Sequence, residues 1–167
     1  MQIDAKMFQD LTLILLLAAT TFTGLLAGAS LDQSIKQLPA RHRIGVQAFS
    51  QYSRAADLAS GVVFYGILGV GALLFSLAAA LSAYFQGVAQ PASSWIYVGA
   101  LLAVLHTLVT AKAAPTNFSQ RMLPADDEAG LAAVFDRFAR WQNLRCALQV
   151  VNFAVELAAV VVFLSYT

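Results

Sequence analysis

Long apolar stretches separated by short polar connections run through this 167-residue chain. Four of the stretches are long enough, or nearly so, for an α-helix to cross the hydrocarbon core of a bilayer, which takes about 20 residues. They cover residues 11–31, 56–85, 94–111 and 144–164. The second exceeds one perpendicular span, so we expect it to tilt or to project from the bilayer. The pattern predicts an all-α fold: a polytopic membrane four-helix bundle in which residues 1–167 form a single transmembrane domain.

The two longer polar connections also have helical patterns. Residues 41–54 alternate apolar with basic and amide side chains, which predicts an amphipathic helix that runs into the second span. Acidic residues 126–128 suit the start of another helix, because carboxylates are favourable at the positive end of a helix dipole. An apolar stripe of Leu131, Phe135 and Phe138 then leads towards the fourth span. We therefore expect helical cytoplasmic extensions of the bundle.

The distribution of basic residues predicts the orientation of the chain. Nine of the ten lysines and arginines lie in these two connections or at their membrane edges, and Lys6 lies on the other side. The positive-inside rule then places both connections in the cytoplasm and both termini outside. We expect an integral, multi-pass protein of a bacterial inner membrane, with the lipid bilayer as its main partner.

Composition excludes several classes of protein. Hydrophobic residues make up 59% of the chain and charged residues 11%, whereas about a quarter of the residues in soluble domains are charged. The net charge of +1 argues against nucleic acid as a partner, which would need a concentrated basic surface. Cys146 is the one cysteine, which excludes an internal disulfide and a cysteine-rich zinc site. We predict no metal and no other cofactor.

Polar residues follow one face of the fourth span and of the helical turns before it. Because successive residues of a helix are about 100° apart, six positions at spacings of three and four fall within an arc of about 120°. Ionisable groups in a spanning helix usually face a bundle interior, a cavity or a partner. This polar stripe is the candidate functional surface, and it consists of Arg137, Trp141, Arg145, Gln149, Asn152 and Glu156.

Three titratable residues are candidates for proton transfer. Glu156 lies about 17 Å from Arg145 along the helix axis, too far for direct pairing, so it is either a proton-transfer group or a neutral acid hydrogen-bonded between helices. His106, in the third span, is either a base or an interhelical hydrogen-bonding group. Asp57 either pairs with Arg54 or meets the basic end of the fourth span.

Glycine and proline positions add local predictions. Gly24 and Gly28 form a GxxxG pattern, which favours close helix packing. Pro115 is expected to end the third helix, and Asn117 to cap the following turn. The second span has an unusually small face, consistent with tight packing or with a ligand crevice; its glycines are Gly61, Gly66, Gly69 and Gly71.

Several short motifs together resemble the anthrone-oxygenase-like family of small four-span membrane proteins. They are Pro115-Thr116-Asn117, Arg140-Trp141 followed by Arg145, Thr23-Gly24 followed by Gly28, and Leu38-Pro39. The resemblance covers nearly the whole chain and implies a four-helix bundle. It also implies oxidation of a polycyclic anthrone to an anthraquinone by molecular oxygen, without metal or flavin. Pro115, Asn117, Trp141 and Arg145 match family positions.

These observations lead to competing functional hypotheses. The first is binding, and oxidation, of a lipophilic aromatic or quinone-like molecule, with His106, Glu156 or Asp57 as base. Arg145 or Asn117 would hold the enolate oxygen of the deprotonated molecule. The further substrate-binding candidates are Trp141, Gln149 and Asn152. The alternative is a non-enzymatic accessory subunit that packs against a larger membrane complex or against itself as a homo-oligomer. A proton-coupled transporter using Glu156 and Asp57 ranks last.

Overall fold

The protein is an all-helical bundle in the computed structural model, which describes the backbone of residues 2–166 and the side chains of residues 10–166. Four helical units are long and apolar enough to cross a membrane: Asp10–Ile44, Val46–Phe85, Ala92–Met122 and Glu128–Ser165. The predicted fold class is therefore confirmed, and the chain has the architecture of a multi-pass integral membrane protein.

Most of the four units contain more than one type of helix. The first comprises α1 (Gln2–Asp32), the π-helical turn η1 (Gln33–Gln37) and α2 (Leu38–Ile44). The second comprises α3 (Val46–Ala55), the π-helical turn η2 (Ala56–Ser60) and α4 (Gly61–Phe85). The third is α5 (Ala92–Phe118) with the 3₁₀ turn η3 (Ser119–Met122), and the fourth is the single helix α6 (Glu128–Ser165).

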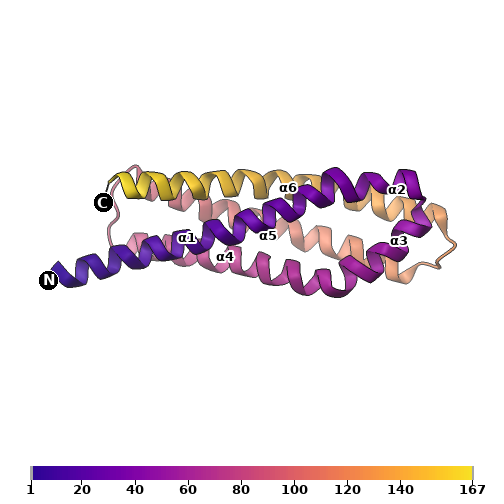
Figure 1. Ribbon diagram of the computed structural model, residues 1–167, viewed down its shortest axis with the longest axis horizontal. Coiled ribbons are helices and arrows are strands. Elements are labelled where there is room, and N and C mark those ends of the chain that lie inside the picture. Colours follow the sequence, from indigo (N-terminus) through magenta and orange to yellow (C-terminus); the bar gives the residue numbers. More distant parts are fainter. Residues whose placement is uncertain (1, 167) are drawn as a thin grey trace.

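The units run in alternate directions, and each packs against two antiparallel neighbours (Figure 1). α1 contacts α4 and α6, and α5 contacts the same two helices from the opposite side. Both chain ends and the turn at 86–91 lie at one end of the bundle, here called the terminal end. α2, α3 and the connection 119–127 lie at the other, the connection end. This is the up-down-up-down arrangement of a four-helix bundle.

The predicted helical extensions are present at the connection end. α3 continues through η2 into α4, as expected from the amphipathic pattern of residues 41–54. α6 begins at Glu128, where the carboxylate of Asp127 accepts a hydrogen bond of 2.9 Å from the backbone nitrogen of Gly130. A side-chain acceptor at this position satisfies one of the free N–H groups of the first helical turn.

The third helix does not end at Pro115, and this prediction was wrong. α5 continues to Phe118, and η3 extends the coil to Met122. Proline removes one backbone donor, but tertiary contacts hold the turns after it. The Gln120 side chain is completely buried and donates to Asn117 Oδ1 at 2.8 Å and to Ser53 Oγ at 3.1 Å. These bonds fix the backbone beyond the proline against α3.

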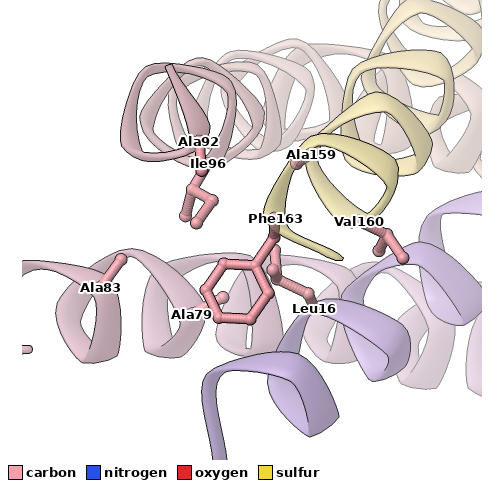
Figure 2. Packing of buried hydrophobic residues seen from close by; sticks show 8 residues of the cluster. All are labelled: Leu16, Ala79, Ala83, Ala92, Ile96, Ala159, Val160 and Phe163. Carbon is pink, nitrogen blue, oxygen red and sulfur yellow. The ribbon is translucent and has the colours of Figure 1, made fainter. Parts of the chain in front are cut away.

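Apolar clusters fill both ends of the bundle. At the terminal end, side chains from all four helices meet, and the ring of Phe163 points towards Ala79 and Leu16 (Figure 2). Alanines at this site let the helices approach closely. At the connection end, a second cluster joins α2, α3, α5 and α6, and the rings of Phe49 and Phe135 meet edge to face with centroids 4.9 Å apart. Between the two ends, much of the buried surface of α6 is polar.

The two glycines of the GxxxG pattern in α1, Gly24 and Gly28, differ in how closely they pack. A Cβ atom at Gly24 would lie 2.8 Å from Cε2 of Phe153 on α6, whereas one at Gly28 would meet nothing within 4 Å. The predicted close packing therefore holds at Gly24 and not at Gly28. Gly28 is instead exposed on the outer face of α1.

Candidate functional site

The polar stripe of α6 faces the interior of the bundle. Four of its members are almost inaccessible, with exposed fractions of 7% for Arg145, 2% for Gln149, 1% for Asn152 and 1% for Glu156. The sequence left open whether this face points inwards, and the structure places it there. Trp141 is partly buried against the apolar cluster of the connection end, and Arg137 is exposed.

Two adjoining cavities lie beside the middle of α6. The larger, of about 290 Å³, is here called the large chamber, and its wall includes Gln33, Asp57, Asn117, Phe118 and Phe138. The smaller, of about 160 Å³, is the small chamber, and its wall includes Leu26, Gly69, Leu73, His106 and Gln149. Both are lined by Tyr65, Gly66, Thr110 and Arg145. Arg145 therefore stands at the junction of the two chambers.

The guanidinium of Arg145 has polar contacts but no ion pair with any side chain of residues 10–166. Its Nη2 donates to Gln33 Oε1 at 3.2 Å, and its Cζ lies 5.8 Å from the centre of the Tyr65 ring. Among residues 10–166, no carboxylate oxygen lies within 4.0 Å of its nitrogens, and Nε has no hydrogen-bond partner. A buried cation is costly unless other groups balance it. Its position suits a ligand that brings an acidic or carbonyl oxygen.

Asp57 faces the large chamber together with Arg145. Its Oδ2 accepts a hydrogen bond of 2.8 Å from Ser53 Oγ. Arg54 does not pair with it; Arg54 Nη2 instead donates to the backbone oxygens of Gln120 and Leu123. Of the two alternatives for Asp57, the structure favours the meeting with the basic end of the fourth span, because a carboxylate and a guanidinium line one cavity.

The two π-helical turns carry polar residues of the large chamber. Gln33 belongs to η1 and Asp57 to η2. A π-helical turn widens the helix locally and appears frequently at functional sites. Here two such turns, on neighbouring units of the bundle, line the same cavity from α1 and from the start of α4. Neither turn has a signal in the sequence pattern.

The small chamber contains polar side chains without protein partners. His106 is 2% exposed, and within the part of the chain whose side chains are described neither ring nitrogen makes a hydrogen bond. The same holds for Oε1 of Gln149. Thr110 Oγ1 is engaged with the backbone oxygen of His106 at 2.8 Å. The histidine and the glutamine are therefore free to bind a ligand.

Glu156 and Asn152 lie beyond both chambers. Glu156 Oε1 accepts a hydrogen bond of 2.5 Å from Ser76 Oγ, and the carboxyl group rests on Gly99, where an added Cβ would lie 2.9 Å from Oε1. This geometry is the interhelical hydrogen bond that the sequence offered as one alternative. Asn152 is 1% exposed, and neither of its amide atoms has a partner among the described side chains.

The predicted site residues thus fall into three groups. Asp57, Asn117 and Arg145 line the large chamber. His106 and Gln149 join Arg145 around the small chamber. Glu156, Asn152 and Trp141 line neither of the two chambers.

Sequence reasoning missed several residues that line the two chambers. Gln33, Tyr65, Phe118 and Phe138 were not assigned to a site, although the glycine face of the second span pointed to a crevice. Gly61, Gly66 and Gly69 do line the chambers. Gly71 packs closely against the ring of Phe22 instead. The small face therefore serves packing at one position and the cavity at three.

A buried polar network adjoins the large chamber through Asn117, which lines it. Gln120 is its centre, because it bonds Ser53 and Asn117 and accepts from Ser50 Oγ at 3.2 Å. Asn117 Oδ1 is therefore occupied by the protein, which leaves the nitrogen of its amide for a ligand.

This arrangement can bind one lipophilic molecule through a cationic group, a carboxylate and several neutral polar groups. Comparisons of the chain with protein-family models, with curated proteins and with solved structures gave no significant match. The resemblance to the anthrone-oxygenase-like family therefore stays a prediction drawn from the motifs.

Proposed function

We propose that this protein binds a lipophilic aromatic or quinone-like molecule in the two chambers, with an acidic or carbonyl oxygen of the ligand on Arg145. The observation that carries this proposal is the guanidinium of Arg145, which is buried at the junction of two cavities without a carboxylate within 4.0 Å in the described chain. Apolar walls with a few convergent polar groups are typical of small-molecule sites. Leu58, Val62 and Phe138 supply such walls in the large chamber.

Access from the side of the bundle supports a ligand dissolved in lipid. Val62, Gly66 and Val70 of α4 line the chambers and are exposed. In a membrane this face of α4 would contact acyl chains. A planar, apolar molecule would then reach Arg145 from the bilayer without crossing the apolar ends of the bundle.

We further propose that the bound molecule is an anthrone-like carbon acid and that the protein oxidises it. Asp57 is the base that best fits this role, because it faces the large chamber with Arg145. Its carboxylate takes a proton from the ring methylene opposite the carbonyl, and Arg145 stabilises the enolate oxygen. His106 is the second candidate base, from the small chamber. Glu156 lies beyond both cavities, which disfavours it.

Molecular oxygen is the oxidant of the proposed reaction. It adds to the deprotonated ring carbon, and the resulting peroxide takes back a proton from Asp57 to give a hydroperoxide. The second hydrogen of that carbon then leaves as a proton while the O–O bond breaks and water departs. One methylene and one O₂ become one carbonyl and one water, so no metal or flavin is needed for the balance.

Oxygen uptake by the purified protein in lipid nanodiscs, with anthrone as the probe, tests this chemistry. We expect uptake above that of empty nanodiscs with formation of anthraquinone, and a loss of roughly a hundredfold or more in Asp57→Asn, as for other general bases. Asp126→Asn, which changes an exposed carboxylate, should keep the wild-type rate. A wild-type rate equal to that of empty nanodiscs would contradict the oxidation.

The accessory-subunit alternative is less well supported. It predicts that neighbouring protein chains fill the glycine face and the polar stripe. The chambers beside Gly61, Gly66 and Arg145 instead favour a small ligand within the chain.

We also propose that the protein lies in a bacterial inner membrane with the connection end in the cytoplasm. Most of its basic residues lie towards that end, which the positive-inside rule assigns to the cytoplasmic side. In spheroplasts, a membrane-impermeant maleimide is expected to label Gln90→Cys directly and Ala125→Cys only after permeabilisation; both positions are exposed. Labelling in the reverse order would invert the orientation. Unmodified protein, whose Cys146 is buried, gives the background.

A further inference from the structure

The small chamber contains more polar groups than the proposed oxidation uses. His106 and Gln149 are each 2% exposed and line it. Both ring nitrogens of His106 and Oε1 of Gln149 lack hydrogen-bond partners within residues 10–166. A buried polar atom without a partner is destabilising, and native proteins keep few of them. Three such atoms around one cavity indicate a ligand group that pairs with them.

We propose that the small chamber is a second polar subsite and that the protein binds most tightly a ring system with two oxygen functions on opposite edges. One oxygen binds Arg145, and the other binds His106 and Gln149. This inference rests on the proposed binding function, and it names molecules built like quinones and quinols as the preferred ligands. A ligand with a single oxygen, such as the anthrone of the proposed oxidation, would bind through Arg145 alone and leave the second subsite without a partner.

The spacing of the anchors fits a compact ring. Gln149 follows Arg145 by four residues on α6, which corresponds to a rise of about 6 Å along the helix axis. His106 lines the same chamber from the neighbouring helix α5. Arg145 and Gln149 are therefore separated by about one helical turn along α6. A fused ring spans this distance without a flexible chain.

The hydrogen-bonding capacity of the subsite matches either a carbonyl or a hydroxyl. A neutral histidine offers one N–H donor and one nitrogen acceptor, and Gln149 Oε1 is an acceptor. A ligand carbonyl would accept from the ring N–H of His106. A ligand hydroxyl would donate to Gln149 Oε1 or to the unprotonated ring nitrogen. Both redox forms of one ligand could thus occupy the same place.

The frame of the small chamber restricts what can bind. Gly66 and Gly69 of α4 have no Cβ atom, and open space of at least 4 Å lies where one would be added. Leu26 and Leu73 form apolar parts of the wall from α1 and α4. A flat apolar ring fits between these surfaces, with its oxygen directed at the two polar side chains.

Two probes of the same carbon skeleton test the second subsite. 1,4-Naphthoquinone has a carbonyl on each side of one ring, and 1-tetralone has one of the two. Their partition into nanodiscs containing the full-length protein is measured against empty nanodiscs by equilibrium dialysis. We expect the wild-type protein to bind 1,4-naphthoquinone about three- to tenfold more tightly, the factor that corresponds to one neutral hydrogen bond.

Variants with side chains of similar volume test which residues cause the preference for 1,4-naphthoquinone over 1-tetralone. His106→Phe and Gln149→Met remove the polar groups and keep similar volumes, so we expect them to abolish the preference and to leave the affinity for 1-tetralone within twofold. Thr23→Val is the matched control, because Thr23 is buried but lines neither chamber; it should keep the preference. Thermal unfolding of each variant verifies the fold, and either variant alone carries the test if the other does not fold.

The outcomes separate this inference from the binding proposal. Equal affinity for the two probes in the wild type, or a preference that survives in both variants, overturns the second subsite while binding at Arg145 stands. Absence of binding for both probes in the wild type, together with no binding of 2-hydroxy-1,4-naphthoquinone, overturns the binding proposal and this inference with it.

Discussion

Replacing Arg145 with glutamine is expected to weaken binding of 2-hydroxy-1,4-naphthoquinone by about ten- to a hundredfold. This probe is a planar, acidic enol, and its anion would receive charge-assisted hydrogen bonds from the guanidinium. Such bonds contribute roughly 1.5–3 kcal/mol, and about 1.4 kcal/mol corresponds to a factor of ten in the dissociation constant. Equilibrium dialysis of nanodisc-embedded protein measures the change.

Two companion variants sharpen the interpretation of Arg145→Gln. Arg145→Lys keeps the charge but loses the planar pair of donors, so its affinity should lie between those of the wild type and Arg145→Gln. Arg140→Gln removes an exposed arginine from the same helix and should bind the probe as the wild type does. Equal affinities in all four proteins would remove the observation on which the proposed function rests.

The stability of Arg145→Gln should change little, which separates binding from folding. The variant breaks the hydrogen bond to Gln33 but leaves no carboxylate within the described residues without its ion-pair partner. It also removes a charge from a buried position, which is itself favourable. A large fall in melting temperature would indicate that Arg145 serves the fold.

The bundle was predictable because one physical constraint dominates it. A segment that crosses a bilayer must satisfy its backbone internally and must be apolar over about 20 residues. The apolar length is visible in the chain, so four spans could be predicted. The start of α6 at Glu128 could be predicted from the acidic residues 126–128, which suit the positive end of a helix dipole. The buried stripe of Leu131, Phe135 and Phe138 followed from helical periodicity in the same way.

The depth of each polar residue could not be predicted from periodicity. The spacing of Arg145, Gln149 and Glu156 places them on one face of α6. It does not predict which of them line a cavity. Which of them meets a cavity depends on the side chains of the neighbouring helices at the same level. Opposite Glu156 these are Ser76 and Gly99, which bind and accommodate the carboxyl group. Opposite Arg145 and Gln149, Gly66 and Gly69 leave space.

Local backbone geometry was also hidden in the sequence. The π-helical turns that hold Gln33 and Asp57 have no residue signature of the kind that glycine or proline provides. Pro115 has such a signature, yet it misled, because the buried Gln120 continues the coil through contacts with α3. In both cases tertiary contacts, absent from a local pattern, decide the conformation.

The polar middle of the bundle contrasts with its apolar ends. Helices in a membrane associate through close packing and interhelical hydrogen bonds rather than through the hydrophobic effect. The terminal cluster and the connection-end cluster supply such packing. The ring nitrogens of His106, both amide atoms of Asn152 and Oε1 of Gln149 lack hydrogen-bond partners in the described chain and contribute little to it. Most of this packing lies at the two ends, but Phe138 of the connection-end cluster also lines the large chamber. A third apolar cluster, of Leu26, Leu68 and Ala72, packs α1 against α4 between the ends.

The connection-end cluster should therefore contribute strongly to stability, and Phe135→Ala is expected to destabilise the protein by about 3–5 kcal/mol, the usual cost of truncating a buried aromatic residue. Phe135 is completely buried and packs edge to face on Phe49 of α3. Phe85→Ala is the matched control, because Phe85 is 80% exposed, and its free energy of unfolding should stay within about 0.5 kcal/mol of wild type. Reversible unfolding in mixed micelles measures both values.

Phe135→Ala should also affect the ligand site, because Phe135 holds α3 against α6 and Ser53 of α3 donates a hydrogen bond to Asp57 in the wall of the large chamber. We therefore expect weaker binding of 2-hydroxy-1,4-naphthoquinone in Phe135→Ala, at temperatures where the protein is still folded, and unchanged binding in Phe85→Ala. A large loss of stability with unchanged binding would show that the wall of the large chamber does not depend on this cluster. Equal stabilities of the two variants would contradict the contribution of the connection-end cluster to stability.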